Sequence, residues 1–255
     1  MQKKKFVTIL LSVMMFLAIA VLGFANVFRI DSVSLVSTTI SSQAEDEAEQ
    51  LQSELNICYI GQNTLFADQS AANEAIVNFP YFRITAFRKE FPNRLVIEVQ
   101  EDEEMFAVET GTDYYVLGGD GMMLGRRNTL ENRSGNYPNI RVVGLTLEYN
   151  VGHVVTGNSL VDGFVSIVKT MASVQGMGGN LRSNVAEITI ANSREMRIQM
   201  KEGVLVRVYN FDENPQAKAE LLVNKYLGLQ DFQKVTGTIQ VGDTVNGLVA
   251  EYYAN

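Results

Sequence analysis

The sequence predicts an α+β protein with one N-terminal transmembrane helix followed by two outer domains. Residues 6–28 form an apolar run without a charged residue. Further along, short stretches of alternating apolar and polar residues, typical of half-buried strands, are interspersed with stretches of apolar residues at helical spacing. The roughly 225 residues after the run are enough for one large or two small domains with their own cores, and we expect two.

The apolar run predicts a membrane anchor. Its 23 residues would span roughly 35 Å as a helix, enough to cross the hydrocarbon core of a bilayer. Because Lys3, Lys4 and Lys5 precede it, the positive-inside rule places residues 1–5 in the cytoplasm and residues 29–255 outside. The alternative is a cleaved secretory signal, but the run is longer than the usual apolar region of such a signal.

Charge narrows the classes of partner. Three of the 21 basic residues and none of the 29 acidic ones lie in the first 28 positions, so the outer part carries a net charge of −11. Such a surface argues against nucleic acid and against a stable electrostatic hold on anionic lipid headgroups. The single cysteine, Cys58, excludes an intramolecular disulfide and is expected to pack as a small apolar residue.

The first outer domain is expected to begin with a strand and a helix. The strand is indicated by an imperfect alternation that starts at the end of the apolar run. Ser42 and Glu45 then form a capping box, which predicts a helix start. The helix presents one narrow apolar stripe made of Ala44, Ala48, Leu51 and Leu55.

A second helix and two strands complete this domain. Asp68 can cap the second helix, and Pro80 ends it. Residues 82–90 and 95–99 are predicted strands joined by a turn at 91–93. The expected order is strand, helix, helix, strand, strand.

The second outer domain is predicted to be rich in strands and to contain two helices. Ser159 can cap the first helix, while Asn214 can cap the second, with Pro215 at its first position. Strands are predicted at residues 105–108, 114–117, 122–124, 186–190, 196–200, 204–208, 237–241 and 246–253.

Five segments of the chain can be read as motifs: FRIDSVSLV directly after the apolar run, NTLFADQ, FPYFRITAFRKEFPNRLVIEVQE, YYVLGGDGMMLG and YPNIRVVGL. Together they resemble the FtsQ/DivIB family of bacterial cell-division proteins. The resemblance implies a POTRA domain with the order βααββ over residues 29–102 and a β domain over residues 103–255. Where the family has Glu-Arg-x-Pro, this chain has Glu101, Asp102, Glu103 and Glu104.

Catalytic chemistry is not expected. A catalytic acid needs a pocket that raises its pKa, and the four consecutive acids from position 101 are interpreted as a solvated linker. The only histidine, His153, has no second histidine with which to complete a zinc site. We therefore expect no enzyme activity, no metal and no cofactor.

The last predicted strand is the candidate binding site, because no later element covers it and an incoming segment could add to its edge. The alternative is that its aromatic residues complete the core and the edge is idle. The site residues are Leu248, Val249, Ala250, Glu251, Tyr252 and Tyr253.

The resemblance implies a specific role for this strand. The C-terminal part of the family's β domain binds small coiled-coil division proteins of the FtsB/DivIC and FtsL type. The expected function is thus a single-pass scaffold of the divisome in the plasma membrane at the septum, coordinating septal peptidoglycan synthesis. The alternative is a POTRA-containing export or assembly component that chaperones exported chains by β-augmentation.

Overall fold

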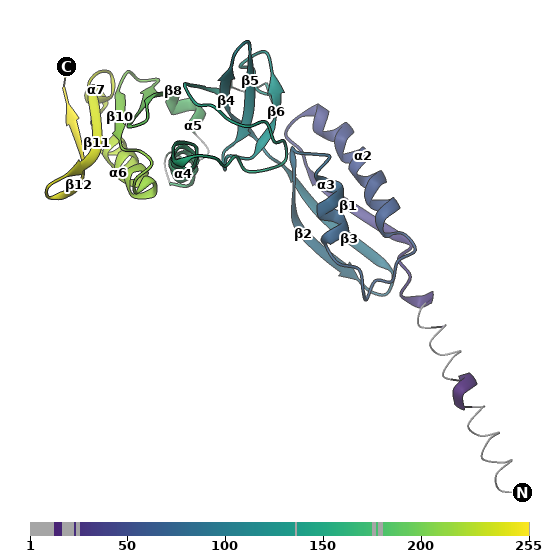
Figure 1. Ribbon diagram of the computed structural model, residues 1–255. Helices are drawn as coiled ribbons and strands as arrows, with labels where there is room; N and C mark the ends of the chain where they lie inside the picture. Colours follow the sequence, from purple (N-terminus) through teal and green to yellow (C-terminus); the bar gives the residue numbers. More distant parts are fainter. Residues whose placement is uncertain are drawn as a thin grey trace, which may run out of the picture. The chain divides into compact units, whose positions relative to one another are not determined.

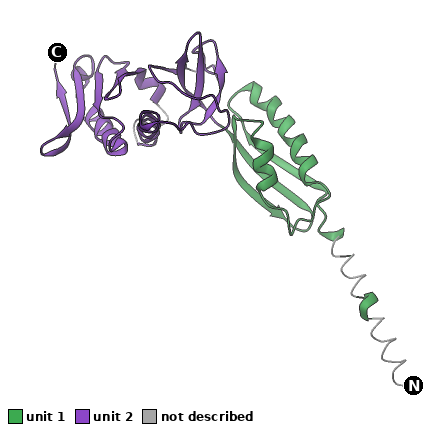
Figure 2. Ribbon diagram, in the orientation of Figure 1, with its two compact units in different colours: residues 1–101 green, residues 102–255 purple. Residues whose placement is uncertain are grey.

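The computed structural model describes residues 13–16, 23, 26–135, 137–174, 177 and 181–254 (Figure 1). The chain divides into two compact units, the first ending at Glu101 and the second beginning at Asp102 (Figure 2). The predicted tail, residues 1–5, and most of the predicted transmembrane run lie outside the described residues. Among the residues that are described, no helix combines the length and apolar character needed to cross a membrane.

The first unit has the predicted order of elements. Its strands form one sheet in the order β1-β3-β2, with β1 parallel and β2 antiparallel to the central β3. Both helices contribute to a single core with this sheet. The elements are β1 (Ser32–Thr38), α2 (Ser42–Tyr59), α3 (Ser70–Ile76), β2 (Phe82–Glu90) and β3 (Arg94–Glu101).

The core of the first unit follows directly from the two periodicities in the sequence. The alternation on β3 buries Leu95, Ile97 and Val99, and the apolar stripe of α2 packs with them. At the end of α2, the Tyr59 hydroxyl donates to the Asp68 carbonyl at 2.6 Å and accepts from the Ala72 amide at 2.9 Å. Burial raises the pKa of Tyr59 to about 12, so this link between α2 and α3 stays protonated at neutral pH.

The beginning of α2 differs from the prediction by one residue. The N-cap is Ser41, whose hydroxyl oxygen accepts from the Ala44 amide at 3.2 Å. The Glu101 carboxylate accepts from the Ile40 amide, the Ser41 amide and the Ser41 hydroxyl at 2.5–2.9 Å. Glu101 is 4% exposed, so its interpretation as a solvated linker residue is wrong. A strand-end carboxylate here satisfies donors at a helix start 60 residues away.

The second unit contains one nine-stranded sheet in the order β12-β11-β10-β9-β8-β7-β4-β5-β6. Neighbouring strands pair antiparallel except at three parallel junctions, β4 with β7, β7 with β8, and β10 with β11. Its elements are β4 (Glu104–Thr110), β5 (Asp113–Gly118), β6 (Met123–Arg127), β7 (Ile140–Val143), α4 (Ser159–Ser173), α5 (Leu181–Asn184), β8 (Val185–Asn192), β9 (Glu195–Met200), β10 (Leu205–Tyr209), α6 (Pro215–Leu227), α7 (Asp231–Lys234), β11 (Thr238–Thr244) and β12 (Gly247–Tyr253).

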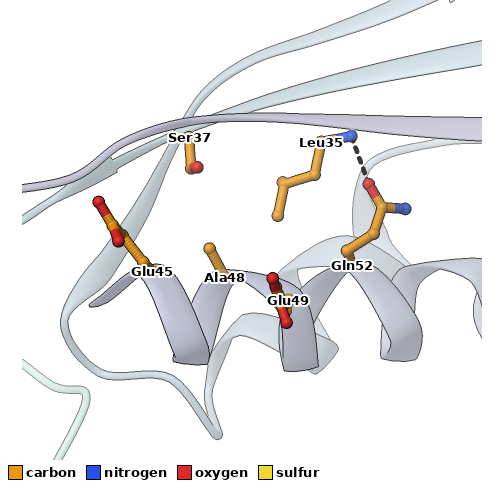
Figure 3. A pocket seen from close by; sticks show the side chains of 6 residues that line it. All are labelled: Leu35, Ser37, Glu45, Ala48, Glu49 and Gln52. Carbon is orange, nitrogen blue, oxygen red and sulfur yellow. Dashed lines mark hydrogen bonds between the residues drawn. The ribbon is translucent and has the colours of Figure 1, made fainter. Parts of the chain in front are cut away.

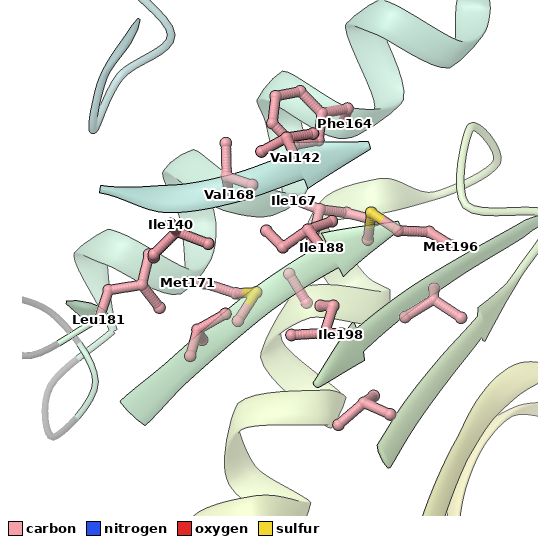
Figure 4. Packing of buried hydrophobic residues seen from close by; sticks show 14 of the residues in the cluster. Ile140, Val142, Phe164, Ile167, Val168, Met171, Leu181, Ile188, Met196 and Ile198 are labelled. Carbon is pink, nitrogen blue, oxygen red and sulfur yellow. The ribbon is translucent and has the colours of Figure 1, made fainter. Parts of the chain in front are cut away.

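One face of this sheet is apolar and packs against α4 and α6. Phe164, Ile167 and Met171 of α4 lie against β7, β8 and β9 (Figure 4). The described part of the unit has four helices rather than the expected two. The two additional helices, α5 and α7, are each four residues long. Helices of one turn show no repeat from which a sequence could reveal them.

Two further acids of the predicted linker are structural. Glu104 is 2% exposed, and its carboxylate accepts from Arg127 Nε at 2.9 Å, the Arg133 amide at 2.9 Å and Asn139 Nδ2 at 3.1 Å. Glu103 pairs with the buried Arg182 of α5. The solvated-linker interpretation is therefore wrong for these residues also, since each carboxylate is matched to a cation from a distant segment.

The start of α6 keeps the predicted residues but not the predicted hydrogen bond. Asn214 is the N-cap and Pro215 occupies the first position. Asn214 has a left-handed backbone, with φ of 49°, and its side chain makes no capping bond. Its role is to turn the chain, which asparagine does at lower cost than most residues.

Candidate binding edge

All six predicted site residues lie on β12, the terminal strand of the nine-stranded sheet. β12 pairs with β11 over seven residues without a register shift. No described strand lies on its other side. β12 is therefore an edge with a regular register, of the kind to which another chain can add.

The register identifies the backbone groups that β11 does not use. Thr244 and Gly247 close the two-residue turn 245–246. In a hairpin of this kind the closing pair exchanges backbone hydrogen bonds, and so does every second pair after it along the two strands. The Leu205 amide of β10 donates to the Gly237 carbonyl at 3.0 Å. The backbone groups of the odd-numbered residues of β11 therefore face β10, and those of the even-numbered residues face β12. The outward backbone groups of β12 thus belong to Leu248, Ala250 and Tyr252.

The side chains of these three residues and of their neighbours serve different purposes. Ala250 and Tyr252 pack against the core of the second unit. The Tyr252 hydroxyl also donates toward the carbonyls of Gln233 and Thr236, at 3.1 and 2.9 Å, which fixes the strand to the segment before β11. Of the two tyrosines that the idle-edge alternative assigns to the core, Tyr252 packs against it and Tyr253 is exposed. The backbone groups of Tyr252 face outward.

The alternate side chains lie on the opposite face of the sheet. Glu251 and Tyr253 are exposed, and Val249 is half-buried. The Tyr253 hydroxyl donates to the Glu251 carboxylate, and this hydrogen bond raises the pKa of Tyr253. An added strand would meet a backbone ladder flanked by one apolar, one acidic and one aromatic side chain.

A buried lysine anchors the β11–β12 hairpin to α6. Lys218 is fully buried, and its Nζ donates to the Asn210 carbonyl and to Asp243 Oδ2, each at 2.8 Å. Asp243 faces Leu248 across the hairpin. Since a buried ammonium without these partners is costly, the contact holds the hairpin in one position.

The open face of the sheet beside β12 carries a charged row. Facing residues share a face, and the register aligns Glu251 with Gln240, Arg207 and Arg197. Both arginines bind Glu195, through Arg197 Nε at 2.9 Å and Arg207 Nε at 2.7 Å. These hydrogen bonds lower the pKa of Glu195 to about 2. Glu195 is therefore ionised throughout the neutral range and is held as a structural anion.

The other end of the same sheet is covered at the beginning of its edge strand. The Met123 amide of β6 donates to the His153 carbonyl at 2.9 Å, and the Met123 carbonyl accepts from the Gly152 amide at 2.8 Å. Met122 and Val154 form a further antiparallel bridge. The segment that contains His153, which the sequence left without a role, therefore occupies the outer side of β6 at its first residue.

In the first unit, a side chain occupies the outer edge of β1. Gln52 of α2 accepts from the Leu35 amide through Oε1 at 2.7 Å and donates from Nε2 to the Val33 carbonyl at 3.0 Å. This amide makes the two bonds that an incoming strand would make. It closes one end of a groove of about 480 Å³ between β1 and α2, lined also by Ser37, Glu45, Ala48 and Glu49 (Figure 3).

The second edge of this sheet, β2, is irregular. Its register with β3 shifts between Ile84 and Ala86, which marks a β-bulge. Bulges bend and twist a strand and are a common way to discourage edge pairing. Of the four described strand edges, β12 combines a regular register with no covering segment.

Catalytic and metal chemistry find no support in the acids that the sequence singled out. Glu101, Glu103 and Glu104 are each tied to structural donors, as described above. Within the described ranges, no group of three or more His, Cys, Asp or Glu residues is arranged to hold a metal ion.

Sequence reasoning missed Gln52 and Lys218. Gln52 adjoins the apolar stripe of α2, and a polar residue beside such a stripe is usually solvated, so nothing in the pattern marks it as an edge cover. Lys218 shares the buried side of α6 with Ala219 and Leu222. Lys218 lies four residues before Leu222, so the two share one face of the helix. This spacing is the one signal in the sequence that indicates a buried lysine.

The fold and the edge define a two-unit α+β protein in which, among the described strands, β12 is an edge with a regular register and no strand along its outer side. No family model matches the chain. Among characterised proteins, it is 23% identical over 182 residues to a cell division protein DivIB of Clostridium tetani, covering 71% of this chain and 62% of that protein. A DivIB of Clostridium acetobutylicum is 20% identical over 146 residues, with 57% and 55% covered.

The chain is thus a relative of the DivIB cell-division proteins, and its resemblance to the FtsQ/DivIB family is confirmed. It spans less than two thirds of the length of these relatives. A structural comparison matched the major extracytoplasmic domain of the trans isomer of DivIB from Geobacillus stearothermophilus, at 15% identity and a TM-score of 0.26, covering 49% of this chain and 97% of that domain.

Replacing Gln52 with leucine should uncover the β1 edge. The Leu35 amide and the Val33 carbonyl lose their partner, so we expect the free energy of unfolding to fall by about 1–2 kcal/mol and the chain to self-associate. Gln50→Leu, an exposed change on the same helix, is the matched control. Urea unfolding and sedimentation in detergent measure both effects. Equal stability and association state in the two variants would show that Gln52 does not guard the edge.

Proposed function

We propose that this chain is a single-pass scaffold protein of the bacterial divisome. Residues 6–28 cross the plasma membrane, residues 1–5 lie in the cytoplasm, and a POTRA domain (29–102) and a β domain (103–255) lie outside at the division septum. There it binds other division proteins of the FtsB/DivIC and FtsL type and coordinates septal peptidoglycan synthesis. The proposal is supported by its DivIB relatives and by the uncovered β12 edge.

The observation that carries the binding role is the row of outward backbone groups on Leu248, Ala250 and Tyr252. A partner segment adds as a further strand and forms a ladder with these groups. The hairpin is already held by Lys218 and by the Tyr252 hydroxyl, so it loses little conformational entropy on binding. The exposed Glu251 favours a partner strand with a basic side chain opposite it.

The alternative is a POTRA-type chaperone that captures exported chains on the edges of the first unit. It has less support, because Gln52 occupies the outer groups of β1 and a bulge interrupts β2. The single POTRA unit also differs from the repeated units usual in such components. We propose a binding protein without enzyme activity, with neither metal nor cofactor.

Localisation tests the divisome role. A fluorescent fusion to the cytoplasmic N-terminus is expected to concentrate at midcell in dividing cells. A fusion that carries the same residues 1–28 but an unrelated outer domain is the control for anchoring alone. A uniform envelope signal throughout the cell cycle would contradict the divisome proposal and would favour the export alternative.

Ala250→Pro tests the binding edge. Proline removes an outward N–H without removing a bond to β11, so we expect affinity for a DivIC-like partner to fall about tenfold with little change in melting temperature. Ala250→Ser keeps the N–H and is the matched control. Binding is measured with the detergent-solubilised chain by biolayer interferometry, and folding by circular dichroism. Parental affinity in a folded Ala250→Pro variant would exclude strand addition at β12.

A further inference from the structure

One end of the first unit exposes large apolar side chains. Phe66 is 82% exposed, Phe91 59%, Ile60 50% and Leu65 48%. We call these four residues the proximal tip. Single exposed apolar residues are ordinary on protein surfaces, but two aromatic and two aliphatic side chains on adjacent turns form a patch that needs an occupant.

Backbone hydrogen bonds join these turns to the segment that leads out of the apolar run. The Gly61 amide donates to the Ile30 carbonyl at 2.8 Å, and the Thr64 amide donates to the Phe28 carbonyl at 2.7 Å. On the other side, the Asp31 amide donates to the Asn93 carbonyl at 3.0 Å. The loops 60–66 and 91–93 are therefore fixed on either side of residues 28–31, at the end of the unit where β1 begins (Figure 1).

Phe28 itself belongs to this arrangement. Its ring makes an edge contact with that of Phe91, with centroids 6.2 Å apart. Phe28 is the last residue of the apolar run, and Ile30, two positions later, is already in the core at 1% exposure. Two residues reach about 7 Å at most, so no linker separates the run from the folded unit.

The charges around the tip do not oppose a membrane. The nearby charges cancel, because three basic residues are matched in number by three acidic ones: Arg29, Lys89 and Arg94 against Asp31, Asp68 and Glu90. The outer part as a whole is acidic. Lys89 Nζ donates to the Leu65 carbonyl at 3.0 Å, which places a cation beside the apolar side chains. The sequence argued against an electrostatic hold on lipid headgroups, and an apolar contact requires none.

We infer that the proximal tip lies in the interfacial region of the bilayer that residues 6–28 cross, with Phe66 and Phe91 among the lipid chains. This inference rests on the membrane anchor of the proposed function. A unit joined to the anchor without a linker cannot move its tip far from the lipid surface, and burying these side chains there removes apolar area from water. The tip and the anchor then act as two attachments that fix the orientation of the first unit.

The chain contains no tryptophan, so one introduced tryptophan reports a single position. We compare full-length Phe66→Trp with full-length Ile40→Trp, each in phosphatidylcholine vesicles with plain or brominated acyl chains. Ile40 is also exposed, but it lies between β1 and α2, at the opposite end of β1. The seven residues of β1 separate the two ends by about 20 Å. Both variants carry the same anchor and the same aromatic group, so they differ in position alone.

For Phe66→Trp we expect blue-shifted emission and roughly twofold or stronger quenching by the brominated lipid, with little of either in Ile40→Trp. Equal and weak quenching in chains that float with the vesicles would overturn the inference while leaving the anchor intact. So would an emission shift that occurs only when a division partner is added, since the tip would then be a protein-binding surface. If neither variant floats with vesicles, the anchor fails and the inference fails with it.

Discussion

The unpaired backbone groups at strand edges are the constraint on which the rest of this structure depends. Each of the two sheets must end in two strands that expose N–H and C=O groups. Three of these four edges are partly covered or interrupted: β1 by the Gln52 amide at Val33 and Leu35, β6 by the segment 152–154 at Met123, and β2 by a bulge. No described strand lies along the outer side of β12. This difference from the other three edges makes β12 the candidate binding edge.

Polar contacts hold this edge in place. Lys218 fixes the hairpin through Asp243, and Tyr252 fixes the C-terminal end of β12 through two carbonyls. On the open face, Glu195 holds Arg197 and Arg207 in place. Both arginines belong to the row of side chains that ends at Glu251. The first unit uses the same device at Glu101, which satisfies the start of α2.

The sequence predicts the parts of the fold that depend on local pattern. The alternation at Leu95, Ile97 and Val99 identifies β3, and Asn214 with Pro215 locates the start of α6. It fails where a side chain finds its partner far along the chain. Glu101 bonds across 60 residues and Glu104 across 35, so a run of four acids resembles a solvated linker although two of them are buried. For the binding edge, the pattern identifies the strand, but the outward groups of Leu248, Ala250 and Tyr252 follow only from the pairing of β10, β11 and β12.

Residue-resolved amide hydrogen exchange, with and without a DivIC-like partner, tests strand addition at β12 most directly. In the free chain, the amides of Leu248, Ala250 and Tyr252 should exchange fast, while those of Val249 and Glu251, bonded to β11, should exchange slowly. Adding the partner should slow the first three and leave the other two unchanged. Binding of the partner without new protection at Leu248, Ala250 and Tyr252 would contradict the account.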